Sequence, residues 1–392
     1  MFSIWWPAFL LPLAMVLGGV AGGVLPGRKY RGPRGVLPSE EQREADRVFC
    51  RFLWQFGLVY AALAFMVMRT VRLVSLSGQR WFLIGAVAVE IIGAALMVIP
   101  VERTLHALFG EDSIVTEQAP AKINLALLVG EKHPDGYHDV TSVMQSVSLC
   151  DTVTARRTSG GTTLTCSDPT LACDETNLAY RAAALFFEET GVEGGAALTL
   201  EKVIPMQAGL GGGSTDAAAV LRALRRLYAP DMPLEELERM AIRLGSDVPY
   251  CVRGATTLVE GRGEHLTQLT ALPACWCVLC KPDIACPTGA MYGEIDRRGA
   301  HLTLDVQEMV RALERGDLAA VCALVGNVFE QVLPPGSEIF AIRDRLLTLG
   351  AGTACMSGSG SAVVGFFSQE EAARSSAAAM TEVPFVRCVG RG

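Results

Sequence analysis

The sequence predicts an α+β fold over about residues 113–392, preceded by a membrane module of three transmembrane helices in residues 1–112. Three observations carry this prediction. Candidate strands come in clusters with helices between them, and the long βαβα alternation of a doubly wound sheet is missing. A glycine-rich loop at residues 205–215 runs directly into a helical pattern rich in alanine and leucine. Three long apolar segments occupy the start of the chain.

The apolar segments each approach the roughly 17–25 residues that a helix needs to cross a bilayer. Tryptophans lie at their ends, as interfacial anchors do. The first segment lacks a basic leading region and a small-residue cleavage site, which argues against a removed signal peptide. A buried helical core is the alternative for any single segment. The segments are residues 4–25, 52–68 and 81–101, and the tryptophans are Trp5, Trp6, Trp54 and Trp81.

The connection between the first two segments carries seven Lys/Arg residues, and the next connection carries three. Because basic loops stay inside, we expect the N-terminus outside and everything after the third segment in the cytoplasm. Glu90, in the middle of the third segment, is a functional candidate because an ionisable group is costly at that depth.

Charge separates the two parts of the chain. Residues 1–112 hold 11 Lys/Arg against 8 Asp/Glu, whereas residues 113–392 hold 23 against 33. An acidic second part argues against a nucleic-acid partner, because duplex binding needs clustered Lys/Arg.

Twelve cysteines are scattered without a regular framework. Cys275, Cys277 and Cys280 share one apolar run, and Cys286 follows it. A metal knuckle is one interpretation, but the paired spacing of zinc sites is missing. We expect a buried strand with free thiols, which fits a reducing cytosol.

Secondary structure in the second part follows from periodicity, beginning in the polar stretch at residues 111–118. Alternation around Ile114 and across residues 123–129 predicts strands, and residues 201–205 predict a short strand that enters the glycine loop. Helical spacing covers residues 177–190, 216–228 and 234–244, with Asp216 and Pro233 as helix starts.

The glycine loop suits a phosphate chain. Its four glycines allow positive φ and close approach of a ligand, and the following helix directs free N–H groups at whatever the loop holds. The hydroxyls of Ser214 and Thr215 can contact phosphate or Mg²⁺. No GK[ST] follows, so this is not a Walker A loop; a flexible linker is the alternative. The predicted ATP-binding residues are Pro205, Met206, Gln207, Ala208, Gly209, Leu210, Gly211, Gly212, Gly213, Ser214 and Thr215.

Lys122 lies in an otherwise apolar strand, where a charge is costly unless it is paired; an exposed edge lysine is the alternative. Asp247 lies at an expected helix end or turn, and its spacing alone fits either a helix cap or a functional carboxylate. A bridge between the two would favour the charged carboxylate and point it at a substrate hydroxyl. Asn124 shares the strand face of Lys122.

Asp135-Gly136 signals a turn, and Tyr137 and His138 follow it. An aromatic ring and an imidazole can sandwich and hydrogen-bond a flat heterocycle. Lys202, just before the glycine loop, is placed to approach a nucleotide or a diphosphate.

The glycine loop resembles the phosphate-binding motif of the GHMP small-molecule kinases. Residues 119–125 (APAKINL) and 134–139 (PDGYHD) narrow the resemblance to the branch that phosphorylates 4-diphosphocytidyl-2-C-methyl-D-erythritol. Residues 244–250 (LGSDVPY) fit that branch too, and residues 356–361 (MSGSGS) match the late glycine motif of the superfamily. The resemblance covers residues 113–390, and the first 112 residues have no counterpart in it.

The resemblance implies the two-domain GHMP kinase fold. An N-terminal ATP-binding domain would cover residues 113–272, a ferredoxin-like C-terminal domain residues 273–392, and the active site the cleft. It implies phosphorylation of the 2-hydroxyl by ATP with Mg²⁺, with Asp247 as catalytic base and Lys122 as its partner. It also implies that Asn124 and Thr288 contact the substrate and that Tyr137 and His138 hold its cytosine.

Two rival functions stay open. One is another GHMP kinase, of the homoserine or mevalonate type. The other is a membrane interaction protein whose kinase-like part is inactive; the presence of Lys122, Asp247 and the glycine loop together argues against it.

Overall fold

The computed structural model describes residues 114–392. The three predicted transmembrane segments, their topology and Glu90 lie outside the described residues. Within residues 114–392, no helix combines the length and the apolar character needed to cross a bilayer.

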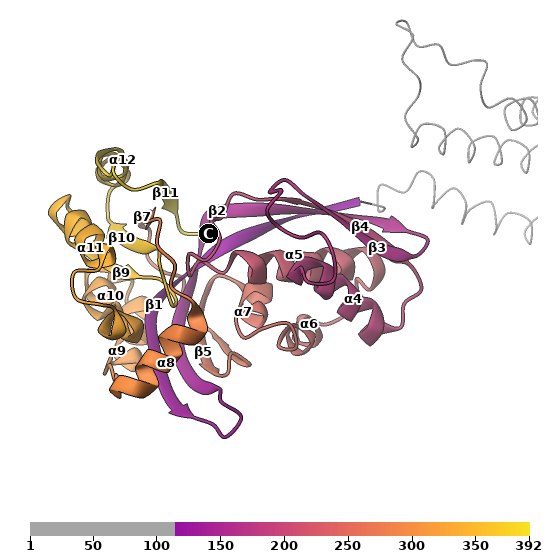
Figure 1. Ribbon diagram of the computed structural model, residues 1–392, viewed down its shortest axis with the longest axis horizontal. Helices are drawn as coiled ribbons and strands as arrows, with labels where there is room; N and C mark the ends of the chain where they lie inside the picture. Colours follow the sequence, from indigo (N-terminus) through magenta and orange to yellow (C-terminus); the bar gives the residue numbers. More distant parts are fainter. Residues whose placement is uncertain (1–113) are drawn as a thin grey trace, which may run out of the picture. The chain divides into compact units, whose positions relative to one another are not determined.

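Seven strands form the first sheet, in the order β3-β4-β2-β1-β8, with β5 on β2 and β6 on β5. Its centre is the long antiparallel hairpin of β1 and β2, drawn in indigo and magenta in Figure 1. The strands are β1 (Ile114–Lys132), β2 (His138–Thr158), β3 (Gly161–Cys166), β4 (Gly195–Glu201), β5 (Thr256–Gly261), β6 (His265–Gln268) and β8 (Gly326–Asn327).

The pairing of β1 with β2 shifts register between Pro120 and Lys122 and again between Asn124 and Ala126. Such irregularities bend a strand and redirect its side chains, and they are frequent beside active sites. Here they enclose the short segment that carries Lys122 and Asn124.

Four helices cover one face of this sheet, as Figure 1 shows. They are α4 (Leu178–Thr190), α5 (Gly212–Tyr228), α6 (Leu234–Ala241) and α7 (Val248–Arg253). Helix α5 is the central one, and the run Ala217, Ala218 and Ala219 is fully buried. Because alanine side chains are short, neighbouring elements pack close around this turn of α5, and the helix start is thereby held beside the sheet.

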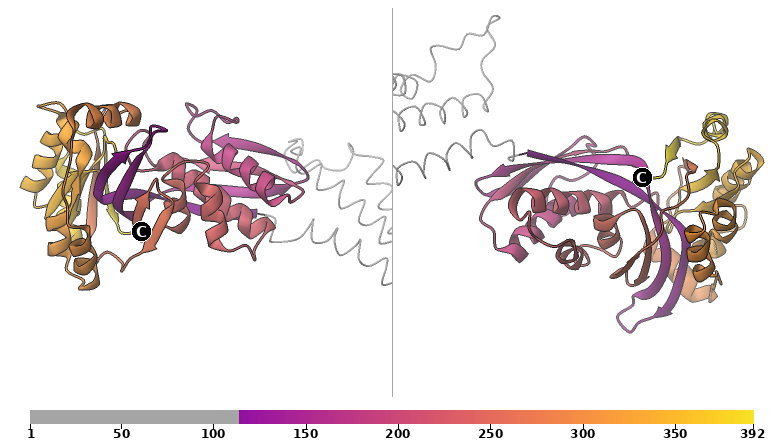
Figure 2. Two further views of the ribbon diagram at one scale, coloured as in Figure 1. Left: turned by 90° about the horizontal axis from the view of Figure 1, so that it is seen from below. Right: turned by 180° about the vertical axis from the view of Figure 1, so that it is seen from behind.

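The second sheet is antiparallel, in the order β11-β7-β10-β9. Numbered along the chain its strands run 4-1-3-2, the βαββαβ order of a ferredoxin-like fold, so the fold implied for the C-terminal part is confirmed. Figure 2 shows this sheet with its helices from two further sides. The strands are β7 (Trp276–Lys281), β9 (Thr353–Met356), β10 (Val363–Phe367) and β11 (Phe385–Gly390).

The remaining helices belong to this half of the described chain. They are α8 (Thr288–Arg298), α9 (Val306–Glu314), α10 (Leu318–Leu324), the 3₁₀ helix η2 (Val328–Val332), α11 (Glu338–Thr348) and α12 (Glu370–Ala379). Strand β7 lies between β11 and β10 and is buried on both faces. Cys277 and Cys280 point to opposite faces of it as free, buried thiols, so the predicted buried strand is confirmed.

Three predicted element bounds are wrong. Strand β4 ends at Glu201, and residues 202–205 form a loop. The Asp151 carboxylate accepts hydrogen bonds from the backbone N–H groups of Val203 and Ile204, which in a strand would donate to a neighbouring strand. Helix α5 begins at Gly212 rather than Asp216. Helix α6 ends at Ala241 instead of Leu244, and residues 242–244 form tighter turns. The start after Pro233 and the helix at residues 178–190, capped by Asn177, are confirmed.

Candidate active site

The glycine loop closes tightly before it becomes a helix. Gly209 and Gly211 both have φ +73°, the left-handed region that favours glycine. A Cβ on Gly209 would lie 2.0 Å from the carbonyl oxygen of Ser357, and one on Gly211 would lie 2.8 Å from Cγ of Lys122. Two of the four glycines therefore use positive φ, and both bring the loop against other parts of the site.

The other two glycines open helix α5. Its first intrahelical bond runs from Thr215 N to Gly211 O at 2.9 Å, so the amides of Gly212, Gly213 and Ser214 have no acceptor within the helix. A Cβ on Gly213 would have no atom within 4 Å. Gly212, Gly213 and Ser214 line an open cavity, and unpaired amides at the positive end of a helix dipole are an arrangement that binds phosphate.

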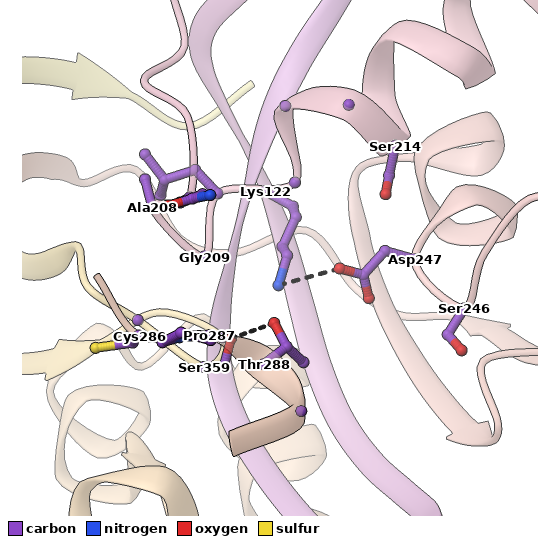
Figure 3. A pocket seen from close by; sticks show the side chains of 18 of the residues that line it. Lys122, Ala208, Gly209, Ser214, Ser246, Asp247, Cys286, Pro287, Thr288 and Ser359 are labelled. Atoms are coloured by element: carbon purple, nitrogen blue, oxygen red, sulfur yellow. Dashed lines mark hydrogen bonds and ion pairs between the residues drawn. The ribbon is translucent and has the colours of Figure 1, made fainter. Parts of the chain in front are cut away.

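This loop lines a cavity of about 1130 Å³. Figure 3 shows Lys122 and Asp247 pointing toward each other in it, with Ser214 nearby. The predicted site residues that line the cavity are Lys122, Asn124, Tyr137, His138, Lys202, Pro205, Met206, Gln207, Ala208, Gly209, Leu210, Gly211, Gly212, Gly213, Ser214, Asp247 and Thr288. Of the predicted set only Thr215 does not line it; its side chain is fully buried.

Lys122 and Asp247 form an ion pair with 3.5 Å between Nζ and the carboxylate oxygen. Lys122 is buried, with 4% of its side chain exposed, so the exposed edge lysine is excluded. Asp247 occupies the N-cap position of α7, but its side chain makes no capping bond. The carboxylate is one-third exposed and free to meet a ligand in the cavity.

Asn124 connects Lys122 to the late glycine stretch at residues 356–361. Its Oδ1 accepts bonds from Lys122 Nζ and from the backbone N–H of Gly358, both at 2.9 Å. Its Nδ2 donates to Ser142 Oγ at 2.8 Å. The Asn124 amide therefore fixes the position of Lys122, whereas its predicted contact with substrate stays a prediction.

Two residues of this network had no motif to reveal them. Asn327, on β8, donates to the carbonyl oxygens of Met356 and Gly358 at 2.8 and 2.7 Å. Glu330, in η2, accepts a bond from the backbone N–H of Met356 at 2.7 Å. Both residues reach the glycine stretch because β8 pairs with the edge of β1. No local pattern in the sequence predicts that pairing.

Lys202 is held between two carboxylates rather than pointing freely at the loop. It contacts Asp151, and its Nζ lies 2.6 Å from Asp216 Oδ2. Burial opposes the charge on Lys202, but Asp216 and Asp151 outweigh it and raise the pKa of the ammonium. Burial also raises the pKa of Asp216 to about 7, against the attraction of Lys202. The predicted approach of Lys202 to a nucleotide stays a prediction.

The turn predicted at Asp135-Gly136 is confirmed by the φ of +90° at Gly136. Tyr137 is 60% exposed beyond it, and the Arg262 guanidinium lies 5.6 Å from its ring centroid. His138 is buried and stacks on Tyr292 with 5.1 Å between ring centroids. Arg262 and Tyr292 also line the cavity; the predicted aromatic site thus gains two residues from β5–β6 and α8 that sequence reasoning missed.

Thr288 is the first residue of α8, and its hydroxyl lies 2.9 Å from that of Ser359. Figure 3 marks this contact, which is drawn just below Lys122. The contact joins the predicted substrate-side position to the late glycine stretch.

No group of three or more metal-ligating side chains occurs in the part of the chain that the structure describes. Mg²⁺ in kinases is held by one or two oxygen side chains together with the phosphates. The Ser214 hydroxyl, which lies on the cavity, fits that mode.

Two family models match regions within the described part of the chain. The family model for the GHMP kinases N terminal domain matches residues 177–255, and that for the GHMP kinases C terminal matches residues 309–384. A 4-diphosphocytidyl-2-C-methyl-D-erythritol kinase from Exiguobacterium sibiricum is 42% identical over 259 residues, 66% of this chain and 90% of the relative. One of the same name from Macrococcus caseolyticus is 38% identical over 283 residues, 71% of this chain and all of the relative.

Solved structures show the same fold. A crystal structure of a 4-(cytidine 5'-diphospho)-2C-methyl-D-erythritol kinase has a TM-score of 0.61 and 35% identity, covering 71% of this chain and 99% of that one. Homoserine kinase from Cytophaga hutchinsonii has a TM-score of 0.57 at 19% identity, covering 71% of this chain and 95% of that one. The second likeness concerns the fold alone.

Proposed function

Since the chain belongs to the 4-diphosphocytidyl-2-C-methyl-D-erythritol kinase family of the GHMP kinases, we propose that it transfers the γ-phosphoryl group of ATP to the 2-hydroxyl of that substrate. The products are ADP and the 2-phosphate, an isoprenoid precursor. One observation carries the proposal: the Lys122–Asp247 pair, 3.5 Å apart, shares a cavity with the free amides that open α5.

The donor side is the glycine loop. The N–H groups of Gly212, Gly213 and Ser214 bind the ATP phosphates, and the helix dipole stabilises their charge. Mg²⁺, when bound with the nucleotide, would neutralise the phosphates further, and the Ser214 hydroxyl would be a side-chain ligand for it. The alanines that bury α5 in the core keep these amides in place before the nucleotide arrives.

The acceptor side is the lysine–aspartate pair. Asp247 accepts the proton of the 2-hydroxyl as the hydroxyl oxygen forms its bond to the γ-phosphorus and the bond from that phosphorus to the β,γ-bridging oxygen breaks. Lys122, held by Asn124, orients the carboxylate through the ion pair. Positioning and charge neutralisation are the main demands of phosphoryl transfer, and this geometry provides both.

Substrate recognition is assigned to further residues that line the same cavity. Tyr137 and His138 bind the cytosine, and Thr288 and Asn124 contact the polar part of the substrate. Lys202 contributes from behind the loop, through its pairing with Asp216 at the start of α5.

An ADP-release assay tests the function. The match to the Macrococcus relative covers all of that protein and 71% of this chain, which is the share of the chain that residues 113–392 make up, so this part is expected to fold alone. ATP should be consumed only when the cytidylated erythritol is present. Consumption with homoserine or mevalonate instead would favour the rival kinase types, and none with any acceptor would favour the inactive interaction protein.

We further propose that residues 1–112 anchor the enzyme in the membrane, with the kinase part in the cytoplasm where ATP is found. The three apolar segments and the basic first connection support this topology. The full chain should sediment with membranes and resist carbonate extraction, and an alkaline phosphatase fusion after residue 112 should be inactive. A soluble full chain would remove the membrane proposal and leave the kinase assignment intact.

A further inference from the structure

Asp296 and His138 form a pair at the substrate end of the cavity. His138 opens β2 and has 5% of its side chain exposed, while Asp296 on α8 is one-third exposed. The distance from His138 Nε2 to Asp296 Oδ1 is 2.7 Å. The second oxygen of Asp296 accepts a bond from Lys132 Nζ at 2.5 Å. One carboxylate is therefore held from both sides by residues of the β1–β2 hairpin.

This pairing determines which imidazole nitrogen carries the hydrogen. Hydrogen bonds from Lys132 and then from His138 lower the pKa of Asp296 below its usual value, so the group is a carboxylate at neutral pH and can only accept. Nε2 of His138 must then be the donor. In the neutral imidazole this leaves Nδ1 without a hydrogen, as an acceptor.

Packing keeps the ring in this orientation. His138 stacks on Tyr292 with an interplanar angle of 24°, and Tyr292 in turn packs edge-on against Phe329 with 5.0 Å between centroids. A rotation that moved Nε2 away from Asp296 would break the stack as well as the hydrogen bond.

The other nitrogen is available to a ligand. Within residues 114–392, Nδ1 of His138 makes no hydrogen bond. It is also not one of the fully enclosed polar atoms that lack a partner, so it is accessible to solvent. Since the ring lines the cavity, its bare acceptor is reached from there.

We propose that Asp296 is a positioning residue that fixes the tautomer of His138, so that Nδ1 accepts a hydrogen bond from the exocyclic amino group of cytosine and rejects uracil. Uracil carries a carbonyl oxygen in place of that amino group, and two acceptors would face each other. The inference rests on the proposed function, because it names how that substrate's base is distinguished.

The test compares the cytidylated substrate with its uridylated counterpart on the full chain. We expect the wild type to prefer the cytidylated form by about tenfold to a hundredfold, mainly through KM, as one lost hydrogen bond and one unpaired acceptor predict. In Asp296→Asn the amide can donate or accept, so both tautomers of His138 become available. The preference should fall by about tenfold, with kcat for the cytidylated substrate changed less than about twofold.

Lys132→Gln is the matched control, because it removes the other partner of Asp296 and leaves the bond to His138. It should keep the wild-type preference. If the pair were only a tie between the hairpin and α8, both variants would lower the melting temperature and neither would change the preference. An active Asp296→Asn enzyme with the wild-type preference would overturn the proposal.

A spectroscopic readout is independent of turnover. The chain has five histidines, and ¹⁵N-histidine spectra of the wild type and His138→Gln identify the His138 signals. We expect hydrogen on Nε2 in the wild type and a mixture of tautomers in Asp296→Asn. Hydrogen on Nδ1 in the wild type would refute the inference even if no variant folded. A wild type that ignores the cytidylated substrate refutes the proposed function instead.

Discussion

The Lys122 ammonium lies 3.5 Å from the Asp247 carboxylate, although the two residues come from a strand and a helix start that are far apart in the sequence. The lysine is buried and the aspartate is partly open to the cavity. An ion pair with this asymmetry keeps the cation fixed and leaves the carboxylate accessible. That is the arrangement a group needs when it must accept a proton from a bound hydroxyl.

Asp247→Asn should abolish turnover and leave ATP affinity nearly unchanged. The amide cannot accept the hydroxyl proton, and loss of a positioned base lowers rates by about 10²–10⁴. The amides of Gly212, Gly213 and Ser214, which bind the nucleotide, are untouched. ADP release and nucleotide binding by calorimetry measure the two effects separately. Unchanged turnover would remove the base assignment, and a large loss of ATP affinity would place Asp247 mainly with the nucleotide.

Gly209→Ala and Gly213→Ala should have opposite effects on stability. A Cβ on Gly209 would lie 2.0 Å from a backbone oxygen at positive φ, and the left-handed conformation alone costs about 1–2 kcal/mol for an L-residue. Gly213 lies inside a helix with open space around it, where alanine is favoured by about 0.5–1 kcal/mol.

Thermal melting of the two variants checks this. Gly209→Ala should melt well below the wild type, and Gly213→Ala at or above it. Because Gly213 lines the cavity, the added methyl of Gly213→Ala should raise the KM for ATP despite the intact fold. Equal melting temperatures for both variants would contradict the described loop geometry.

The sequence predicted the parts of this site that local chemistry determines. A lysine in an apolar strand needs a partner, and an aspartate beside a glycine at a helix start is a credible one, so the Lys122–Asp247 contact could be anticipated. The start of α5 was missed by one turn because glycine is a poor helix former. Glycine nevertheless occupies the first turn of α5, at Gly212 and Gly213, where a side chain would obstruct the loop or a ligand.

Contacts that depend on tertiary arrangement could not be anticipated. Asn327 acts only because β8 reaches the edge of β1, and Tyr292 only because α8 is placed against the hairpin. The pattern of residues 202–205 predicts a strand, but the buried Asp151 carboxylate on β2 accepts hydrogen bonds from two of its backbone N–H groups and the segment forms a loop. In each case the decisive partner is more than thirty residues away in the chain, beyond any periodicity.

Asn327→Ala should reduce kcat and stability together. It removes two hydrogen bonds to the late glycine stretch and leaves the carbonyl groups of Met356 and Gly358 buried, at about 1–3 kcal/mol for each unsatisfied group. Gly358 donates to Asn124, and Asn124 accepts a hydrogen bond from Lys122. A less ordered glycine stretch should therefore also disturb the Lys122–Asp247 ion pair. Ser337→Ala, which removes a cap on α11 and none of these hydrogen bonds, is the control: it should lower the melting temperature without a change in kcat. Unchanged kcat in Asn327→Ala would show that the network is only structural.

Because of Asp216, the free energy of unfolding should decrease as the pH rises from about 4 to about 7. Burial raises the pKa of this carboxyl group from 3.8 to about 7 in the folded protein. Between these values the folded state binds more protons than the unfolded state, so the free energy of unfolding decreases with rising pH. The stabilising contribution is complete below the unfolded pKa and is lost through the folded one. Asp216→Asn has no such titration.

The difference in melting temperature between wild type and Asp216→Asn isolates this one group from all others. It should shift in favour of the variant as the buffer moves from pH 5 to pH 8. Asp231→Asn, at an exposed position, should track the wild type across the same range. A constant difference would mean that Lys202 keeps Asp216 ionised throughout, and the triad with Asp151 would then be a permanently charged element beneath the glycine loop.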